Sequence, residues 1–414
     1  MVNKRLQTAI KLSPAFSALR HHNYRLWFFG QMISLMGTWM QSVAQGWLVY
    51  EISGSSLALG SIAFLGTLPT LFLMLPAGAI ADRVPKQRIL LVTQSVMMLC
   101  AFVLTYLAAV GMVQVWHIAT LAVILGIAQS FDAPCRQSMT VEMVEDRQDL
   151  ASAIALNSMM FNMARIVGPA VGGLILATLG AVWCFGINGA TFLAVLAALA
   201  LMRFPTSPKP AKRLQLITEI KVGVSFAWHN TSVRSIIIVA GSAAMFGMTY
   251  SVLLPAIAAD VLHVGEAGLG YLATSVGVGA LAGSVTLASL GSRVRKGLLL
   301  TVGNLCLPIG LLLFAFSSTL PLAMVSLVLV GWAWITQNAT ANTLVQLLVP
   351  DEIRGRVMAL YMLVLFGSGP FNSALAGILG QAIGAGPAIA IGAVVTLIFG
   401  IAVAFGSPSL RRTR

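Results

Sequence analysis

The chain has 414 residues, of which 58% are hydrophobic and only 9% are charged, and its formal net charge is +13. Soluble globular proteins carry roughly 25% charged residues. This composition, with a mean hydropathy of +0.91, therefore excludes a soluble fold and an intrinsically disordered chain.

Apolar segments long enough to cross a bilayer recur along the whole chain. A hydrocarbon core about 30 Å thick requires roughly 20 apolar residues in a helix. Dividing the sequence at charged residues and at proline and glycine breaks gives twelve segments, at about 25–50, 57–81, 89–110, 113–132, 151–178, 181–202, 234–259, 267–290, 298–317, 320–340, 354–383 and 387–406. We predict an all-α integral membrane protein with twelve transmembrane helices in two six-helix bundles.

The basic residues alternate with these segments. Of the 25 Lys and Arg residues, Arg165 falls inside a predicted helix, and the other 24 lie near the two ends of the chain and in every second loop. The opposite loops contain no Lys or Arg, and their charged residues are Glu51, Asp260 and Glu266. Because basic loops stay in the cytoplasm, we predict a multi-pass protein of the cytoplasmic (inner) membrane with both termini inside. The basic excess then reflects topology and contact with membrane lipids, and nucleic acid is not an expected partner.

One long polar segment, residues 204–230, divides the chain and is predicted to be a cytoplasmic linker. Within it, apolar residues recur at steps of three and four, at Ile217, Ile220, Val224 and Trp228. This spacing predicts a short helix on the inner membrane face, and the alternative is the start of the seventh span. We predict an N-terminal six-helix bundle over 1–203 and a C-terminal one over 231–414.

The two halves also correspond weakly in sequence. Arg83-Val84 after the second segment matches Arg293-Val294 after the eighth, and Gly168-Pro169 in the fifth matches Gly369-Pro370 in the eleventh. A parallel repeat of two bundles is typical of transporters that work by alternating access, with the substrate near the midplane between the halves.

Two motifs carry a resemblance to a known family. The loop Gly78-Ala-Ile-Ala-Asp82-Arg83-Val-Pro85-Lys86-Gln-Arg88 resembles the G-x-x-x-D-R-x-G-R-R signature of the major facilitator superfamily, with Pro85 in place of its glycine. Gly168-Pro169-Ala-Val-Gly172-Gly173 resembles the G-P-x-x-G-G core of the antiporter motif of that superfamily's exporters.

Further motifs along nearly the whole chain resemble one branch, the enterobactin exporters or transmembrane secretion effectors. They include Asn23-Tyr-Arg25-Leu-Trp27, Gly37-Thr-Trp39-Met-Gln41, Phe131-Asp132-Ala-Pro134-Cys-Arg136 and Val349-Pro350-Asp351-Glu352-Ile-Arg354. The resemblance implies a secondary transporter that exports a small organic molecule, such as a siderophore or a drug-like amphiphile. It also implies proton antiport, with protons as the coupling ion.

Charged residues near the inner ends of the second, third and fourth segments form a candidate gate. Asp82, Arg83 and Arg88 lie at the predicted cytoplasmic mouth, and Asp132 and Arg136 are one helical turn apart. We predict that they pair when the mouth closes and separate when it opens, and the resemblance implies the same role for Asp82 and Arg83. The alternative is interfacial charge that only sets topology.

The fifth segment contains a cation at membrane depth and a candidate hinge. Charges there are costly and usually face a cavity or a partner, and Pro169 removes the hydrogen bond to the Arg165 carbonyl. Arg165 is a candidate to bind a substrate anion, a transient carboxylate or a local carbonyl. Gly168, Gly172 and Gly173 permit close helix approach and, with Pro169, form either a hinge or a packing face.

Polar residues line one face of the first segment at steps of three and four, namely Gln31, Ser34, Thr38, Gln41 and Gln45. Such a stripe is unsuited to lipid and should face the protein interior. We predict that Gln31, Thr38 and Gln41 lie along the substrate path with Arg165, and that Gln337 and Asn338 of the tenth segment join them. Hydrogen bonding between helices is the alternative.

Motifs for other functional classes are absent from the sequence. The five histidines are scattered, no Ser/His/Asp arrangement or HExxH is present, and the four cysteines lack metal-site spacing. No ATP-binding GxxxxGK[ST] occurs, so we expect neither an enzyme, a cofactor nor a metal. The remaining alternatives are an importer or lipid translocator of the same fold, and a non-transporting membrane receptor or assembly factor.

The predicted topology can be tested by labelling from one side of the membrane. Cysteines introduced by Glu51→Cys, Asp260→Cys and Glu266→Cys should react with an impermeant maleimide added to intact cells, because these loops are predicted to be external. Arg295→Cys is the matched control and should react only in inverted vesicles. Labelling of the acidic positions from the inside alone would overturn the topology.

Overall fold

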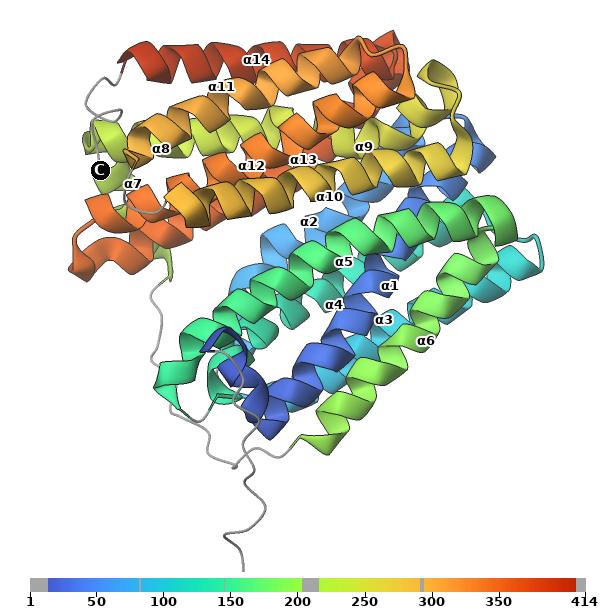
Figure 1. The fold of residues 1–414 in the computed structure, drawn as a ribbon, viewed down its shortest axis with the longest axis horizontal. Coiled ribbons are helices and arrows are strands. Elements are labelled where there is room, and N and C mark those ends of the chain that lie inside the picture. The colour runs from blue at the N-terminus through green and yellow to red at the C-terminus, as the bar shows by residue number, and fades with distance from the viewer. Residues whose placement is uncertain (1–13, 82, 145, 203–215, 291–293, 407–414) are drawn as a thin grey trace, which may run out of the picture.

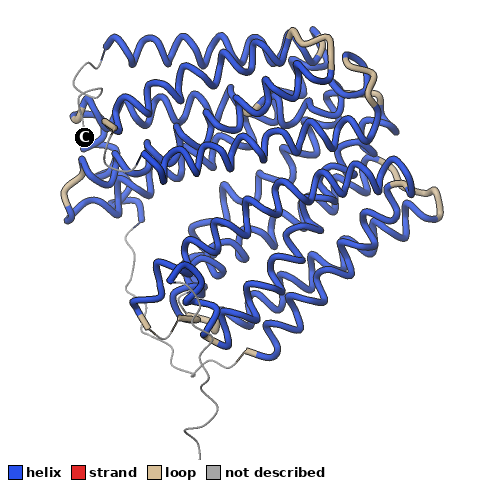
Figure 2. The backbone as a smooth tube through the Cα atoms, viewed as in Figure 1, coloured by secondary structure: helices blue, strands red, loops and turns tan. Residues whose placement is uncertain are grey.

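The computed structural model describes residues 14–81, 83–144, 146–202, 216–290 and 294–406, and every regular element within these ranges is helical (Figure 2). The first half of the chain forms η1 (Pro14–Arg20), α1 (His22–Ser53), α2 (Ser56–Ala81), α3 (Lys86–Ala109), α4 (Val115–Glu142), η2 (Arg147–Asp149), α5 (Leu150–Leu179) and α6 (Ala181–Leu201). The second half forms α7 (Leu216–His229), α8 (Thr231–Ser242), η3 (Ala243–Gly247), α9 (Thr249–Ala256), η4 (Ile257–Val261), α10 (Gly265–Leu290), α11 (Lys296–Ala315), α12 (Leu320–Leu348), α13 (Asp351–Ile383) and α14 (Ala385–Gly406). The elements η3 and η4 are single π-helical turns.

The helices form two bundles that diverge toward the side of the linker (Figure 1). In the first bundle, α1 packs against α5 and α6, α3 against α4 and α6, and α2 against α4. In the second, α12 packs against α10 and α11, and α11 against α14. The all-α, two-bundle prediction is confirmed.

Eleven helical stretches of the described residues are long and apolar enough to cross a membrane. They correspond to eleven of the twelve predicted segments. The twelfth is α1, whose glutamines, serines and threonines lower its hydropathy, although its 32 residues span roughly 48 Å at about 1.5 Å per residue. A helix of this composition crosses a bilayer because its polar face packs against protein, as α1 does against α5 and α6.

The fourth predicted segment ended too early. We expected it to stop near residue 132, but α4 continues to Glu142. Asp132 and Arg136 interrupt the apolar sequence without interrupting the helix, because they pair with each other one turn apart. The carboxylate of Asp132 therefore lies within the helix and not at its end.

Much of the predicted linker, residues 204–215, lies outside the described residues. Its remaining part is α7, which packs against α13 and leads into α8. At the other end of the chain, η1 packs against α5. Hydrogen bonds from Ser17 and His21 hold the pKa of the Asp149 carboxyl below its ordinary value, so the residues around η1 are attached to the N-terminal end of α5.

Glycines bring backbones of the two bundles into direct contact at two crossings. At the first, α2 meets α13, with Gly60 against Gly377. At the second, α5 meets α10, and a Cβ added to Gly173 would lie 2.6 Å from the Cα of Gly270. Small residues permit such approach between membrane helices, so these crossings fix how the bundles dock.

The crossing of α5 and α10 yields a stability prediction. Gly173→Val should destabilise the protein by about 1–3 kcal/mol, because the added carbons overpack a backbone contact. Thermal unfolding of the purified protein in detergent measures this loss. Gly355→Ala is the control, since a Cβ there meets no atom within 4 Å, and equal melting temperatures for both variants would contradict the close contact.

Candidate functional site

A cavity of about 570 Å³ lies between the two bundles. Its walls come from α1 to α6 of the first bundle and from α9 and α10 of the second. Pockets of this size accommodate drug-sized molecules. The lining is mainly apolar, with polar groups concentrated on α1, and is shared by both halves of the chain.

The polar face of α1 divides between the cavity and the protein interior. Thr38, Gln41 and Gln45 line the cavity, as does Asn188 of α6. The Asn188 amide donates a hydrogen bond of 2.6 Å to the side-chain oxygen of Gln41. Asn188 was missed in the sequence, where a lone asparagine in an otherwise apolar segment was the available signal.

Arg165 of α5 is the one charged side chain among the described residues that line the cavity. Its guanidinium lies 5.8 Å from the centre of the Trp39 ring, a cation–π distance. It also interacts with the hydroxyl of Tyr250, which α9 contributes from the second bundle. A cation from one half and a phenol from the other therefore meet at the cavity wall.

The segment of α5 before Pro169 packs closely against α10. A Cβ on Gly277 of α10 would lie 2.8 Å from the Arg165 carbonyl oxygen, the acceptor that Pro169 leaves without its helical donor. Thr274, one turn earlier, donates a hydrogen bond of 3.3 Å to the carbonyl of Ile166. Residues of the second bundle therefore lie directly against the backbone of α5 in the turn before Pro169.

The remaining glycines of the predicted hinge face the first bundle. A Cβ on Gly168 would lie 2.5 Å from the Cβ of Trp39, and one on Gly172 would lie 3.0 Å from the Cα of Met40. These glycines pack α5 against α1, whereas Gly173 packs it against α10. The motif therefore places α5 between its own bundle and the other one.

Three predicted substrate-path residues do not line this cavity. Gln31 is buried in α1. Gln337 is fully buried in α12 and donates a hydrogen bond of 3.2 Å to the carbonyl of Val239. Asn338 donates to the carbonyl of Trp334 in its own helix. In this conformation these three side-chain amides lie between or along packed helices and do not face the cavity.

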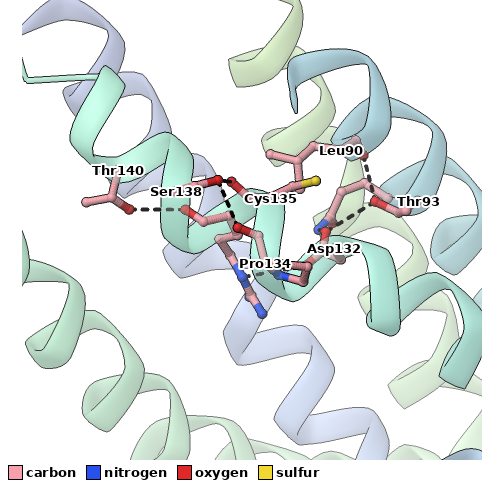
Figure 3. Close-up of polar contacts among 9 residues, drawn as sticks. Leu90, Thr93, Asp132, Pro134, Cys135, Ser138 and Thr140 are labelled. Atoms are coloured by element: carbon pink, nitrogen blue, oxygen red, sulfur yellow. Dashed lines mark hydrogen bonds and ion pairs between the residues drawn. The ribbon is translucent and has the colours of Figure 1, made fainter. Parts of the chain in front are cut away.

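Toward the end of the first bundle where α3 begins, Asp132 is the centre of a buried polar cluster (Figure 3). Its side chain is almost fully buried. The carboxylate accepts hydrogen bonds from Gln94 at 2.7 Å and Thr93 at 3.2 Å, both on α3, and pairs with Arg136 at 3.4 Å. Gln94 was missed because nothing in the sequence marks it as a neighbour of α4.

The other charged residues of the predicted gate lie on the rim of the first bundle. Lys86 at the start of α3 forms an ion pair with Glu142 at the end of α4. Arg83 and Arg88 are exposed, and Asp82 lies outside the described residues. The ion pairs that are described at this end, including Asp351–Arg354 in α13, each lie within one bundle.

Contacts at the opposite end join the two bundles. The Tyr50 hydroxyl of α1 donates a hydrogen bond to the Asp260 carboxylate of η4. The Gln381 side chain of α13 accepts hydrogen bonds from the Ser55 hydroxyl at 2.8 Å and from the Leu57 backbone at 3.3 Å. Neither contact was predicted, because each pairs residues more than 200 positions apart.

The site contains no metal-binding geometry: no cluster of three or more His, Cys, Asp or Glu side chains is placed to hold an ion within the described ranges. The arrangement is instead that of a cavity between two bundles, closed by contacts at one end.

The protein-family comparison identifies the chain. A family model described as transmembrane secretion effector matches residues 13–411. The chain belongs to this family. It is a transporter of the major facilitator superfamily and not an enzyme, as the sequence motifs predicted.

Characterised relatives align over nearly the whole chain. The multidrug efflux pump Tap of Mycolicibacterium fortuitum is 27% identical over 391 residues, covering 92% of this chain and 95% of the relative. The enterobactin exporter EntS of Escherichia coli O1:K1 / APEC is 26% identical over 407 residues, covering 98% and 94%.

Solved structures share the fold at low sequence identity. The nucleoside transporter NupG aligns with a TM-score of 0.75 at 12% identity, over 94% of this chain and 99% of that one. A bacterial homologue of the lysosomal transporter Spinster aligns with a TM-score of 0.70 at 15% identity, over 95% and 97%.

The contact between Tyr50 and Asp260 yields a prediction about closure of this end of the cavity, which the topology predicted from the basic loops places outside the cell. Tyr50→Phe should raise the labelling rate of Ser42→Cys in the cavity by an external impermeant maleimide roughly two- to tenfold, because a typical intramolecular hydrogen bond contributes about 0.5–1.5 kcal/mol net. Tyr106→Phe, on an exposed part of α3, is the control. An unchanged rate in Tyr50→Phe would show that this contact does not hold the end closed.

Proposed function

We propose that the chain is a secondary active transporter that exports a small organic molecule, a siderophore or a drug-like amphiphile, by alternating access. The observation that supports this best is the cavity of about 570 Å³, whose walls come from both bundles and whose outer end is crossed by contacts between them. When two rigid bundles rock about a site that they share, the site opens alternately to the two sides of the membrane. The relatives named as efflux pump and exporter support the direction.

The membrane orientation follows the basic loops, with both termini in the cytoplasm and proposed domains of 1–203 and 231–414 joined by the linker 204–230. In this orientation the contacts of Tyr50 and Gln381 close the external side. The conformation described is then the one that receives substrate from the cytoplasm, which is the loading step of an exporter.

The proposed inner gate consists of Asp82, Arg83, Arg88, Asp132 and Arg136. Support comes from the separation of charges at this end, where the described ion pairs remain within single bundles while the outer end is joined. The gate would close by bringing the exposed arginines toward acceptors on the second bundle. Attraction at such a mouth is screened by water and ions, so the pairs can form and break during transport.

The proposed hinge is Gly168, Pro169, Gly172 and Gly173 in α5. These residues lie between α1 and α10 and permit backbone contact on both sides. A proline inside a helix leaves one backbone hydrogen bond unmade, so bending there costs less than elsewhere.

We assign proton coupling to Asp132, because it is the most buried acidic side chain among the described residues. Its carboxylate contacts Gln94 and Thr93 of α3 and Arg136 of α4. The transporter would then exchange protons for the organic substrate. Membrane lipids would surround the two bundles.

Inverted membrane vesicles provide the test. The probe is enterobactin, and the vesicle interior is made acidic. Wild-type vesicles should then accumulate enterobactin. If one proton leaves for each substrate molecule that enters, a gradient of two pH units permits up to about hundredfold accumulation. Asp132→Asn should abolish the dependence on the gradient, because the amide does not carry a proton.

The control for this experiment is Asp146→Asn, which removes an exposed carboxylate and should leave the gradient dependence intact. Gradient-independent accumulation by the wild type would contradict proton antiport. Uptake only by right-side-out vesicles would contradict export.

A further inference from the structure

We infer that the transported molecule carries a negative charge and that Arg165 is the residue that binds it. This inference rests on the proposed transport function and specifies its substrate class as an amphiphilic organic anion. The observation behind it is the charge composition of the cavity. Arg165 is the one charged side chain among its described lining residues, and none of those residues is an aspartate or a glutamate.

The neighbours of Arg165 do not neutralise it. The Trp39 ring at 5.8 Å contributes a cation–π contact, and Tyr250 contributes a neutral hydroxyl. The ion pairs in the described part of the chain involve other residues, and each lies at an inner rim of a bundle. The positive charge therefore stands in the cavity without an acidic partner there.

The energetic consequence favours an anionic ligand. A cation at the centre of a membrane helix costs at least about 2.5–3.5 kcal/mol on insertion scales. In a cavity of reduced dielectric constant, an opposite charge on the ligand is attracted more strongly than in water, and a like charge is repelled equally strongly. A guanidinium also binds carboxylate, sulfonate or phosphate groups with two parallel hydrogen bonds.

The rest of the lining suits the body of such a molecule. Met97, Leu125 and Phe192 supply apolar walls, and Trp39 presents an aromatic ring beside the cation. Gln41, which accepts from Asn188, adds an amide to the polar side of the cavity. A molecule with an acidic group at one end and an aromatic or aliphatic body at the other satisfies both sides.

Tetraphenylborate and tetraphenylphosphonium provide the sharpest probes, because they match in shape and apolar surface and differ in the sign of their charge. Binding to the purified protein in uncharged detergent is measured by equilibrium dialysis. We expect tetraphenylborate to bind at least tenfold more tightly than tetraphenylphosphonium to the wild type. Arg165→Met should remove this preference, and Arg165→Lys should keep part of it.

The control is Arg295→Met, which removes one positive charge from the exposed start of α11, away from the cavity. It should retain the wild-type preference, which separates binding at Arg165 from attraction to the net charge of the protein. Equal binding of both ions to the wild type, tighter binding of the cation, or an unchanged preference in Arg165→Met would overturn the inference. If Arg165→Met does not fold, the wild-type comparison and Arg165→Lys still decide it.

Failure of this inference is distinct from failure of the proposed function. Vesicles that accumulate a neutral or cationic amphiphile in a gradient-dependent manner would leave export intact and exclude anion selectivity. Vesicles that accumulate no probe, from a protein that still prefers tetraphenylborate, would leave the anion site intact and contradict transport.

Discussion

Direct backbone packing of α5 between two neighbours is the constraint on which the rest of the structure depends. Gly168 and Gly172 admit α1, and Gly173 with Gly270 admits α10. Because no side chains separate these helices, α5 belongs to one bundle and also forms part of the seam with the other. Arg165, one turn before Gly168, is thereby placed at the boundary between the bundles, where the cavity opens.

The same packing explains why polar groups are tolerated at membrane depth. The glutamines of α1 and the arginine of α5 face protein or cavity, so the lipid-facing surface remains apolar. Asn188 and Tyr250 complete the polar lining from different bundles. Polar and charged side chains, which would be costly in lipid, are therefore concentrated in the cavity, where a ligand would contact both bundles. The hydrogen bond of Tyr50 to Asp260 joins the two bundles at one end of that arrangement.

The sequence was sufficient for the helical fold because hydropathy reports directly on the number of long apolar segments. It also marked Thr38, Gln41 and Arg165, since polar residues in apolar helices must find protein partners. It did not reveal Tyr250 or the contact of Tyr50, because contacts between distant helices depend on crossing geometry that a single sequence does not encode. The end of the fourth segment was misplaced at Asp132 because hydropathy measures apolar content and not helicity.

The central claim is that the two bundles rock about the cavity, so that its ends open alternately. Distances between paired spin labels measure this directly, with one pair replacing Leu57 and Ile383 at the outer end and another replacing Val141 and Leu347 at the inner end, all exposed positions. On addition of substrate and a change of pH, the account predicts that the outer distance lengthens while the inner distance shortens. Distances that stay fixed, or that change in the same direction at both ends, would contradict it.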